Sequence, residues 1–164
     1  MNDAILRPAP SPERAAVVDL IQRGRAAMKA LAGAPQERID EAVAALAWSV
    51  YKPENALALA QLAVEDTGLG NVQDKVTKNQ RKTFGTLRDL LRVRTVGVIE
   101  EDRARGLVKY GKPVGVVAAI CPSTNPAATP VNKAMMALKG ANAVVIAPSP
   151  SGAATTTRTV ALMR

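Results

Sequence analysis

Apolar residues recur at helical spacing through the first half of the chain, and boundary residues divide them into four segments. The first helix is predicted to begin at Ser11, where a capping hydroxyl precedes a proline and an acid, and to close at Gly33. Three more helices are predicted over residues 35–51, 54–67 and 71–91. Their apolar positions, expected to face the core, are Val17, Leu20, Ile21, Met28 and Leu31, then Ile39, Val43, Leu46 and Val50, and finally Val72, Val76, Leu87 and Leu91.

From residue 93 onward, short apolar runs replace the helical spacing. The segments RTVGVIEED and GLVKYGK flank a charged turn at residues 101–105 and predict a β-hairpin. The next run, over residues 114–120, is continuously apolar, which is typical of a strand buried on both faces.

That strand opens a parallel βαβ unit. A crossover helix is predicted over residues 127–139, with inward-facing Val131, Met135 and Leu138, and Gly140 is placed to end it. A second buried strand follows over residues 143–147. Crossovers of this kind are nearly always right-handed. Another helix is predicted to begin at residue 155 and to remain incomplete at Arg164.

Composition narrows the class of protein. At 164 residues, with 48% hydrophobic and 22% charged residues, the chain suits one soluble globular domain. Aromatics make up only 2%, so the core must be built from aliphatic residues, which suits helices packed closely on a sheet. We expect a mobile lead-in over residues 1–10. Without an apolar run of about 18 residues or a signal peptide, we expect no membrane span and a cytoplasmic protein.

The formal net charge of +8 raises the possibility of an anionic partner. A basic stripe attracts nucleic acid or phosphorylated ligands, and it is equally the solvated face of a helix and a hairpin. Few aromatic residues are available to stack on bases, and no known nucleic-acid motif is present, so nucleic acid is the less favoured partner. The basic residues concerned are Lys75, Lys78, Arg81, Lys82, Arg88, Arg92, Arg94, Arg103, Arg105, Lys109 and Lys112.

One cysteine and no histidine exclude several kinds of chemistry within this chain. An internal disulfide and a multi-cysteine zinc site are excluded, as are a Ser-His-Asp triad, a Cys-His pair and an HExxH metal helix. We therefore predict no metal site. Cys121 lies near a predicted helix start, where a thiolate is favoured. No histidine can activate it, so a buried structural cysteine is the favoured interpretation.

Two polar loops follow the two predicted core strands. In the first, CPSTNP at residues 121–126, Ser123, Thr124 and Asn125 lie beside free backbone N–H groups, where an anion or a developing oxyanion is stabilised. The alternative is that Ser123 or Thr124 merely caps the helix. The second loop, APSPSG at residues 147–152, is expected on the same sheet edge, where α/β folds bind ligands, although ordinary turn chemistry also explains it.

Three segments, in this order, resemble the aldehyde dehydrogenase superfamily, and most closely its CoA-acylating branch. AVEDTGLGNVQDKVTKN resembles the family's acidic-Thr-Gly-x-Gly segment and the DK-x-x-KN that follows it. GKPVGVVAAICPSTNPAAT resembles its Pro-Val-Gly-Val strand and STNP loop, and NKAMMALKGANAVVIAPSP resembles its next helix and second strand. The resemblance extends from Ala15 onward and implies an α/β fold with a Rossmann-like cofactor domain.

The resemblance implies oxidation of a small aldehyde by NAD or NADP through a thioester, which CoA takes up to give acyl-CoA. It also implies a homo-oligomer. Asn125 becomes a candidate catalytic oxyanion donor. The resemblance places Cys121, Pro122, Ser123, Thr124 and Asn125 on the nicotinamide side, and Ala147, Pro148, Ser149 and Pro150 nearer the adenosine.

The chain departs from the family pattern in three respects. Ala147 stands where non-acylating relatives have a ribose-binding lysine, which favours the acylating branch. Ser149 and Ser151 stand where that branch usually has a histidine and a basic residue. The family's nucleophilic cysteine and catalytic domain lie downstream of the matched region. We therefore expect residues 11–164 to form an incomplete cofactor-binding domain that is inactive alone, or a non-catalytic remnant that binds a nucleotide or a partner.

Overall fold

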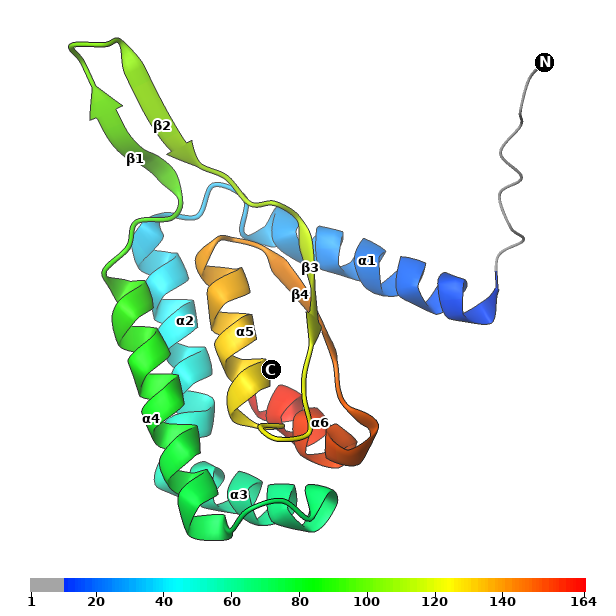
Figure 1. Cartoon of the computed structure of the whole chain (residues 1–164). Coiled ribbons are helices and arrows are strands. Elements are labelled where there is room, and N and C mark those ends of the chain that lie inside the picture. The colour runs from blue at the N-terminus through cyan, green and yellow to red at the C-terminus, as the bar shows by residue number, and fades with distance from the viewer. Residues whose placement is uncertain (1–10) are drawn as a thin grey trace.

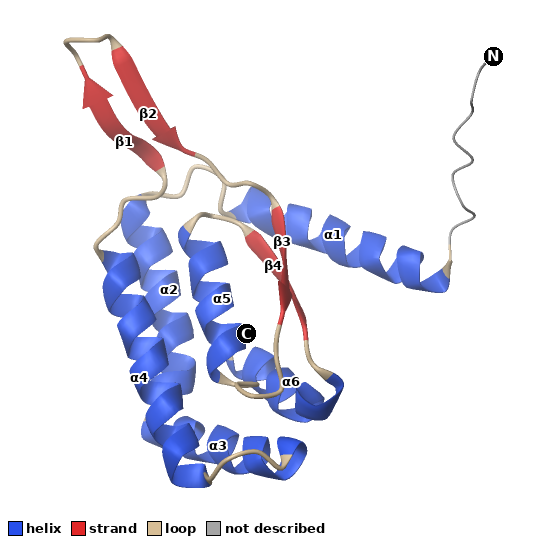
Figure 2. Ribbon diagram, in the orientation of Figure 1, coloured by secondary structure: helices blue, strands red, loops and turns tan. Residues whose placement is uncertain are grey.

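A computed structural model describes residues 11–164, so the lead-in expected over residues 1–10 lies outside the described part. The α/β class expected from the sequence is confirmed (Figure 2). The elements are α1 (Pro12–Ala30), α2 (Gln36–Tyr51), α3 (Pro53–Thr67), α4 (Val72–Leu91), β1 (Gly97–Asp102), β2 (Leu107–Gly111), β3 (Val116–Ile120), α5 (Ala128–Lys139), β4 (Ala143–Ala147), a 3-10 turn (Pro150–Gly152) and α6 (Ala153–Leu162).

The elements form layers around the short β3–β4 sheet (Figure 1). Helix α1 covers one face of this sheet, and the crossover helix α5 packs against the other. Helices α2 and α4 pack on the far side of α5, while α3 runs below them and reaches α6. The β1–β2 hairpin extends away from these layers, as Figure 1 shows. No helix within residues 11–164 combines the length and apolarity needed to cross a membrane.

The parallel βαβ unit expected from the sequence is confirmed. Strands β3 and β4 pair in parallel over their whole length, from Val116 opposite Ala143 to Ile120 opposite Ala147. Asn142 fixes the start of this pairing, because its Oδ1 accepts hydrogen bonds from the backbone N–H groups of Val114 and Gly115 at 2.7 and 3.0 Å. Its Nδ2 donates to carbonyl oxygens at the end of α5, so one amide joins the helix end to both strands.

The predicted core faces of α2 and α5 are largely correct. Ile39, Val43 and Val50 of α2 have no exposed surface, and they pack in one cluster with Val131 and Met135 of α5. Aliphatic side chains thus fill the space between these helices, as the low aromatic content required.

The expectation that α1 is a core helix is wrong. It begins as predicted, with the Ser11 hydroxyl accepting from the backbone N–H of Arg14, but none of its residues is buried, and Val17 is 53% exposed. Only its C-terminal half lies on the sheet, where a Cβ at Gly24 would come within 3.0 Å of Val116. After Gly24 the helix continues to Leu31, which packs against the core, whereas its N-terminal half extends beyond the sheet (Figure 1) and leaves Val17 and Leu20 exposed.

Helix α4 also departs from expectation. Its buried residues are polar: Lys75, Asn79 and Thr83 face inward, whereas Leu91, expected in the core, is 45% exposed. The Asn79 amide donates to the carbonyl of Ala56 at 3.3 Å, which supplies a partner for a buried helix carbonyl. Polar residues therefore join α4 to α3. Burial, with a smaller effect of Lys78, lowers the pKa of Lys75.

Strand β3 is not buried on both faces, contrary to expectation. Only Ala119 within it is buried, while Ile120 is 75% exposed. In the described residues the sheet has two strands, so α1 and α5 together leave much of it uncovered. The hairpin turn spans residues 103–106 and overlaps the predicted 101–105, because β1 extends to Asp102, whose Oδ1 accepts from the backbone N–H of Arg105 at 3.1 Å.

A buried charge connects α5 to α2. Lys139, in the last turn of α5, is 1% exposed, and its ammonium pairs with the carboxylate of Asp40. Gln36 donates to the same carboxylate at 2.9 Å, and its own Oε1 accepts from the backbone N–H of Thr95 at 2.7 Å. The Thr95 hydroxyl contacts the carbonyl of Lys139. This network joins α2, α5 and the segment leading into the hairpin.

Asp40→Leu is expected to lower the free energy of unfolding by about 3–5 kcal/mol, because it leaves the Lys139 charge buried and unpaired. Lys139→Met should cost less, since Asp40 keeps its bond from Gln36 and its side chain is 26% exposed. The double variant should recover much of the loss in a urea titration followed by circular dichroism. Arg38→Ala, which breaks an exposed ion pair with Glu41, is the control and should cost below about 1 kcal/mol. If the loss of unfolding free energy in the double variant equalled the sum of the two single-variant losses, the coupling between Asp40 and Lys139 would be contradicted.

Candidate functional site

The two polar loops lie at the carboxyl ends of the paired strands, as expected from the sequence. Ile120 pairs with Ala147 at the end of the sheet, and the backbone N–H of Cys121 donates to the carbonyl of Ala147 at 2.8 Å. The loop at residues 121–126 and the loop at residues 147–152 therefore leave the sheet side by side. We call this pair of loops the strand-end crevice, after the crevice in which α/β folds bind ligands at this edge of the sheet.

The first loop does not serve as a side-chain cap. Helix α5 begins at Ala128, its N-cap is Ala127, and no side chain bonds to its first turn. The alternative that Ser123 or Thr124 caps the helix is therefore wrong. Thr124 accepts only a long hydrogen bond of 3.4 Å from the neighbouring Asn125 amide. The Ser123 and Thr124 side chains are thus not used to cap α5.

Asn125 carries an unsatisfied polar atom. Its Oδ1 is buried and has no hydrogen-bond partner among residues 11–164, and its Nδ2 makes only the long contact to Thr124. A buried polar atom without a partner is costly unless something else supplies one. Because the two ends of an amide can exchange places by a flip, this side chain can offer either an acceptor or a donor in the crevice.

Cys121 is a buried thiol, which favours the structural interpretation. It is 1% exposed, and its Sγ lies 3.8 Å from the carbonyl oxygen of Ala119. Burial raises the pKa of the thiol, and the nearby Lys133 ammonium opposes this effect. The Lys133 Nζ donates to the carbonyl of Ile120 at 2.5 Å, at the end of β3. At neutral pH the thiol stays protonated, so it is a poor nucleophile.

The second loop is held by its own backbone and by the first loop. A 3-10 turn closes it, with the N–H of Gly152 donating to the carbonyl of Ser149 at 3.0 Å, and the hydroxyls of Ser149 and Ser151 lie 3.4 Å apart. Any Cβ at Gly152 would come within 3.0 Å of the Pro126 side chain. Glycine thus allows the two loops to pack in contact.

Reasoning from sequence missed the residues that fasten these loops. The carboxylate of Asp66, at the end of α3, accepts hydrogen bonds from the N–H and hydroxyl of Thr155 at 2.9 and 3.0 Å. The Thr156 hydroxyl donates to the carbonyl of Pro126 at 3.0 Å. The one sequence signal was Asp66 itself, within the acidic-Thr-Gly-x-Gly segment. A spacing pattern cannot show that this segment meets α6, 89 positions along the chain.

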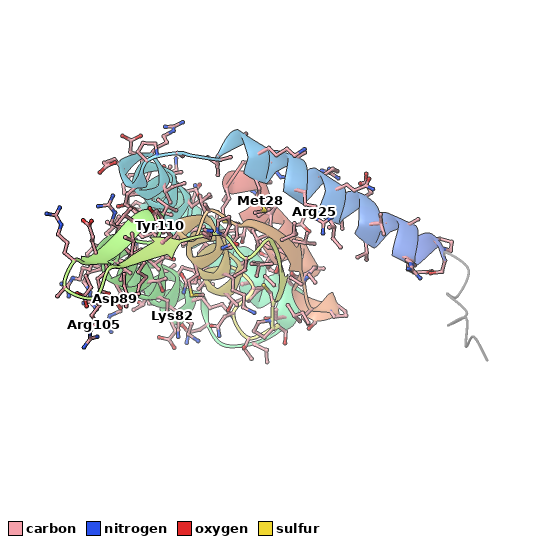
Figure 3. The ribbon with its side chains drawn as sticks, turned by 90° about the horizontal axis from the view of Figure 1, so that it is seen from above. Arg25, Met28, Lys82, Asp89, Arg105 and Tyr110 are labelled. Atoms are coloured by element: carbon pink, nitrogen blue, oxygen red, sulfur yellow. The ribbon has the colours of Figure 1, made fainter. Side chains whose placement is uncertain are left out.

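Residues 11–164 lack a clustered set of metal ligands, and part of the basic stripe is buried or held in ion pairs. They contain no cluster of three or more His, Cys, Asp or Glu residues that could hold a metal ion. The basic stripe is divided: Lys75 is buried, and some of the others are paired with acids. Figure 3 labels Lys82 on α4 and Arg105 at the hairpin turn. The ion pairs are Arg88–Asp89, Arg103–Glu101, Arg105–Asp102 and Lys109–Glu100.

A hollow of about 830 Å³ lies away from the crevice. It is bordered by the C-terminal half of α1, where Figure 3 labels Arg25 and Met28, and by the base of the hairpin. None of the predicted site residues lines it. We therefore place the candidate site at the strand-end crevice, whose two loops carry the predicted polar side chains.

Comparison with known proteins gives matches over most of the chain. Residues 2–164 match the Aldehyde dehydrogenase family. The chain is 56% identical to the sulfoacetaldehyde dehydrogenase (acylating) of Cupriavidus necator over 137 residues, which is 84% of this chain and 28% of that protein. It is 41% identical to the succinate-semialdehyde dehydrogenase (acetylating) of Clostridium kluyveri over 147 residues, which is 90% of this chain and 32% of that one.

The structural comparison agrees with the sequence comparison. The crystal structure of an acetylating aldehyde dehydrogenase from Geobacillus thermoglucosidasius superimposes with a TM-score of 0.86 at 38% identity. The match covers 91% of this chain and 32% of that structure. The chain therefore spans 28–32% of the length of these relatives.

The raised pKa of Cys121 predicts a stability change in alkaline solution. Its stabilising contribution is fully present below the pKa of an unfolded cysteine, about 8.5, because both states are then protonated. As the pH rises through the folded value, the unfolded state has already released its proton, so the free energy of unfolding falls. Urea titrations between about pH 7 and about pH 10 should show a steeper decline for the natural chain than for Cys121→Ala. Parallel declines would contradict the assignment.

Proposed function

Because the chain belongs to the aldehyde dehydrogenase family, we propose that its strand-end crevice is the cofactor site of a CoA-acylating aldehyde dehydrogenase. The family expected from the sequence is confirmed, and the relatives named above are acylating or acetylating enzymes. The proposed reaction converts an aldehyde, CoA and NAD(P)+ into acyl-CoA and NAD(P)H. Residues 11–164 then form part of the cofactor-binding domain.

The observation that carries the proposal is the pair of loops at one edge of a parallel strand pair, together with the unsatisfied Asn125 oxygen in the first loop. Cofactors bind at this edge in α/β folds. The residues fit a nucleotide, because the two loops, residues 121–126 and 147–152, offer hydroxyls, an amide and backbone N–H groups and contain no acidic residue of their own. We assign residues 121–125 to the nicotinamide side and residues 147–150 to the adenosine side. Bound NAD(P)+ supplies the hydride acceptor.

Asn125 is the residue that we assign to the reacting carbonyl. Its amide N–H is a donor suited to a developing oxyanion, and such a donor is effective because it is held in place before the reaction. The other catalytic group, the nucleophile, is not supplied by Cys121, whose thiol is buried and protonated. We therefore propose that these 164 residues bind cofactor and do not form the thioester alone.

The names of the relatives suggest a substrate class. Sulfoacetaldehyde and succinate semialdehyde are both short aldehydes with an anionic group at the opposite end from the carbonyl. The relatives named for them are 56% and 41% identical to this chain. We propose a short anionic aldehyde as the substrate, with sulfoacetaldehyde as the first compound to test.

We also propose a cytoplasmic homo-oligomer. The projecting β1–β2 hairpin leaves apolar side chains in solvent, and Leu107, Val108 and Tyr110 are 59%, 46% and 58% exposed. Exposed apolar side chains gathered on a projecting element favour contact with another protein surface. The charge pairing along the hairpin reduces its attraction for nucleic acid.

The proposal predicts saturable binding of NAD+ or NADP+ by isothermal titration calorimetry. Asn125→Ala should weaken that binding about fivefold, which corresponds to one lost hydrogen bond. Gln73→Ala, which removes an exposed amide on α4, is the control and should leave affinity unchanged. If neither nucleotide binds, or if both variants behave alike, the crevice is not the cofactor site.

A second prediction concerns catalysis by the 164-residue chain itself. With sulfoacetaldehyde, CoA and NAD+, it should produce neither NADH absorbance nor acyl-CoA detectable by mass spectrometry. The acylating enzyme of Cupriavidus necator serves as the positive control under the same conditions. Turnover that disappears in Cys121→Ser would show instead that Cys121 is the nucleophile.

A further inference from the structure

We infer that Asp66 is a positioning residue for the strand-end crevice, acting through Thr155 and Thr156 of α6. Asp66 lies in the last turn of α3, where a negative charge opposes the helix dipole. That position is locally unfavourable, and α3 has no basic residue in the same turn to offset it. The carboxylate therefore gains its stabilisation from another element.

The element that receives this carboxylate is the start of α6. The N-cap of α6 is Gly152, which has no side chain to cap the helix, and the first turn contains no acid. Asp66 Oδ2 accepts from both the backbone N–H and the hydroxyl of Thr155 at 2.9 and 3.0 Å. It thus does what an N-cap side chain does, but from a different helix. Thr155 is fully buried, which shields this charge-assisted pair from water.

The same turn of α6 holds the first loop of the crevice. Thr156, 2% exposed, donates its hydroxyl to the carbonyl of Pro126 at 3.0 Å, directly after Asn125. Gly152, at the start of α6, lies so close to the first loop that a Cβ there would come within 3.0 Å of Pro126 and 3.5 Å of Ser123. A series of contacts therefore runs from Asp66 through the start of α6 to the loop that bears Asn125. Without the Asp66 cap, we expect the second loop to become less ordered and its contacts with the first loop, through Thr156 and Gly152, to weaken as well.

The inference rests on the proposed function only in calling the crevice a cofactor site, because the positioning itself is testable without ligand. Cys121 begins the first loop and is 1% exposed, so its labelling rate with a small disulfide reagent reports how often that loop opens. It is the sole cysteine of the chain, so the signal is unambiguous.

The key variants are Asp66→Ala and Thr156→Val, with Thr159→Val as the matched control. Thr159 is also fully buried in α6, but its hydroxyl donates only to the carbonyl of Thr155 within the same helix. Thr156→Val, which removes one hydrogen bond, should raise the Cys121 labelling rate about fivefold over the control, and Asp66→Ala, which removes two bonds to a charged acceptor, should raise it at least about tenfold. Asp66→Asn, which keeps an acceptor oxygen, should restore most of the protection.

Global stability is separated from local opening by measuring urea unfolding of each variant by circular dichroism. Labelling rates are then compared at urea concentrations that give equal free energies of unfolding. If Asp66→Ala does not fold, Thr156→Val and Asp66→Asn decide the question. Labelling of Thr156→Val no faster than that of Thr159→Val under matched conditions would overturn the inference.

Added NAD+ distinguishes the two proposals. If the crevice binds nucleotide, saturating NAD+ should slow Cys121 labelling in the natural chain, because binding favours the closed loop. Asp66→Ala should then need about fivefold more NAD+ for the same protection. Faster labelling in the variants without any effect of NAD+ would support the positioning role and reject the cofactor site. An NAD+ effect of equal size in all variants would support the cofactor site and reject the positioning role.

Discussion

The buried ion pair between Lys139 and Asp40 is the interaction on which the arrangement of helices and sheet depends. It fixes the end of the crossover helix α5 to α2, at a point where both partners lie largely out of solvent. A lysine with 1% exposure remains in the interior only if its charge is compensated. Gln36 extends the same network to Thr95, so the hairpin segment leaves the helical layer from a fixed point. Because β4 begins directly after this end of α5, the pair anchors the point from which the second strand of the sheet starts.

Polar side chains make many of the connections between elements because the core has few large residues. With aromatics at only 2%, aliphatic side chains provide bulk but little directional specificity. Direction comes from hydrogen bonds between elements far apart in the sequence. Asn142 aligns the strands, Asn79 joins α4 to α3, and Asp66 joins α3 to α6. Each satisfies buried backbone or hydroxyl groups that would otherwise be costly.

The strand-end crevice combines this rigidity with unused hydrogen-bonding capacity. Its surroundings are well fastened, through the strand pairing on one side and the start of α6 on the other. Within it, the Asn125 amide has no close partner. A preorganised donor or acceptor in a fixed loop is what binding and catalysis both require. The same contacts keep Cys121 buried, so its thiol is a poor nucleophile although it begins the first loop of the crevice.

Sequence patterns predicted the helices and strands well wherever neighbouring residues determine where an element begins or ends. Ser11 begins α1, Gly68 follows α3, and the strands fall within the predicted apolar runs. Burial was predicted less well. Periodicity finds an apolar face but not its partner, so it misplaced α1 and overestimated the cover on β3. The polar inner face of α4 was missed because buried Lys75, Asn79 and Thr83 look like surface residues until their neighbours are known.

By itself, the sequence determined the order of the helices and strands, the location of both polar loops and the family to which the chain belongs. These depend on neighbouring residues and on motifs, which can be read along the chain. Only the tertiary structure decided that no serine or threonine caps α5, that Cys121 is a buried thiol, and that Asp66 caps α6. These features depend on contacts between residues far apart in the sequence, and folding in three dimensions brings those residues together.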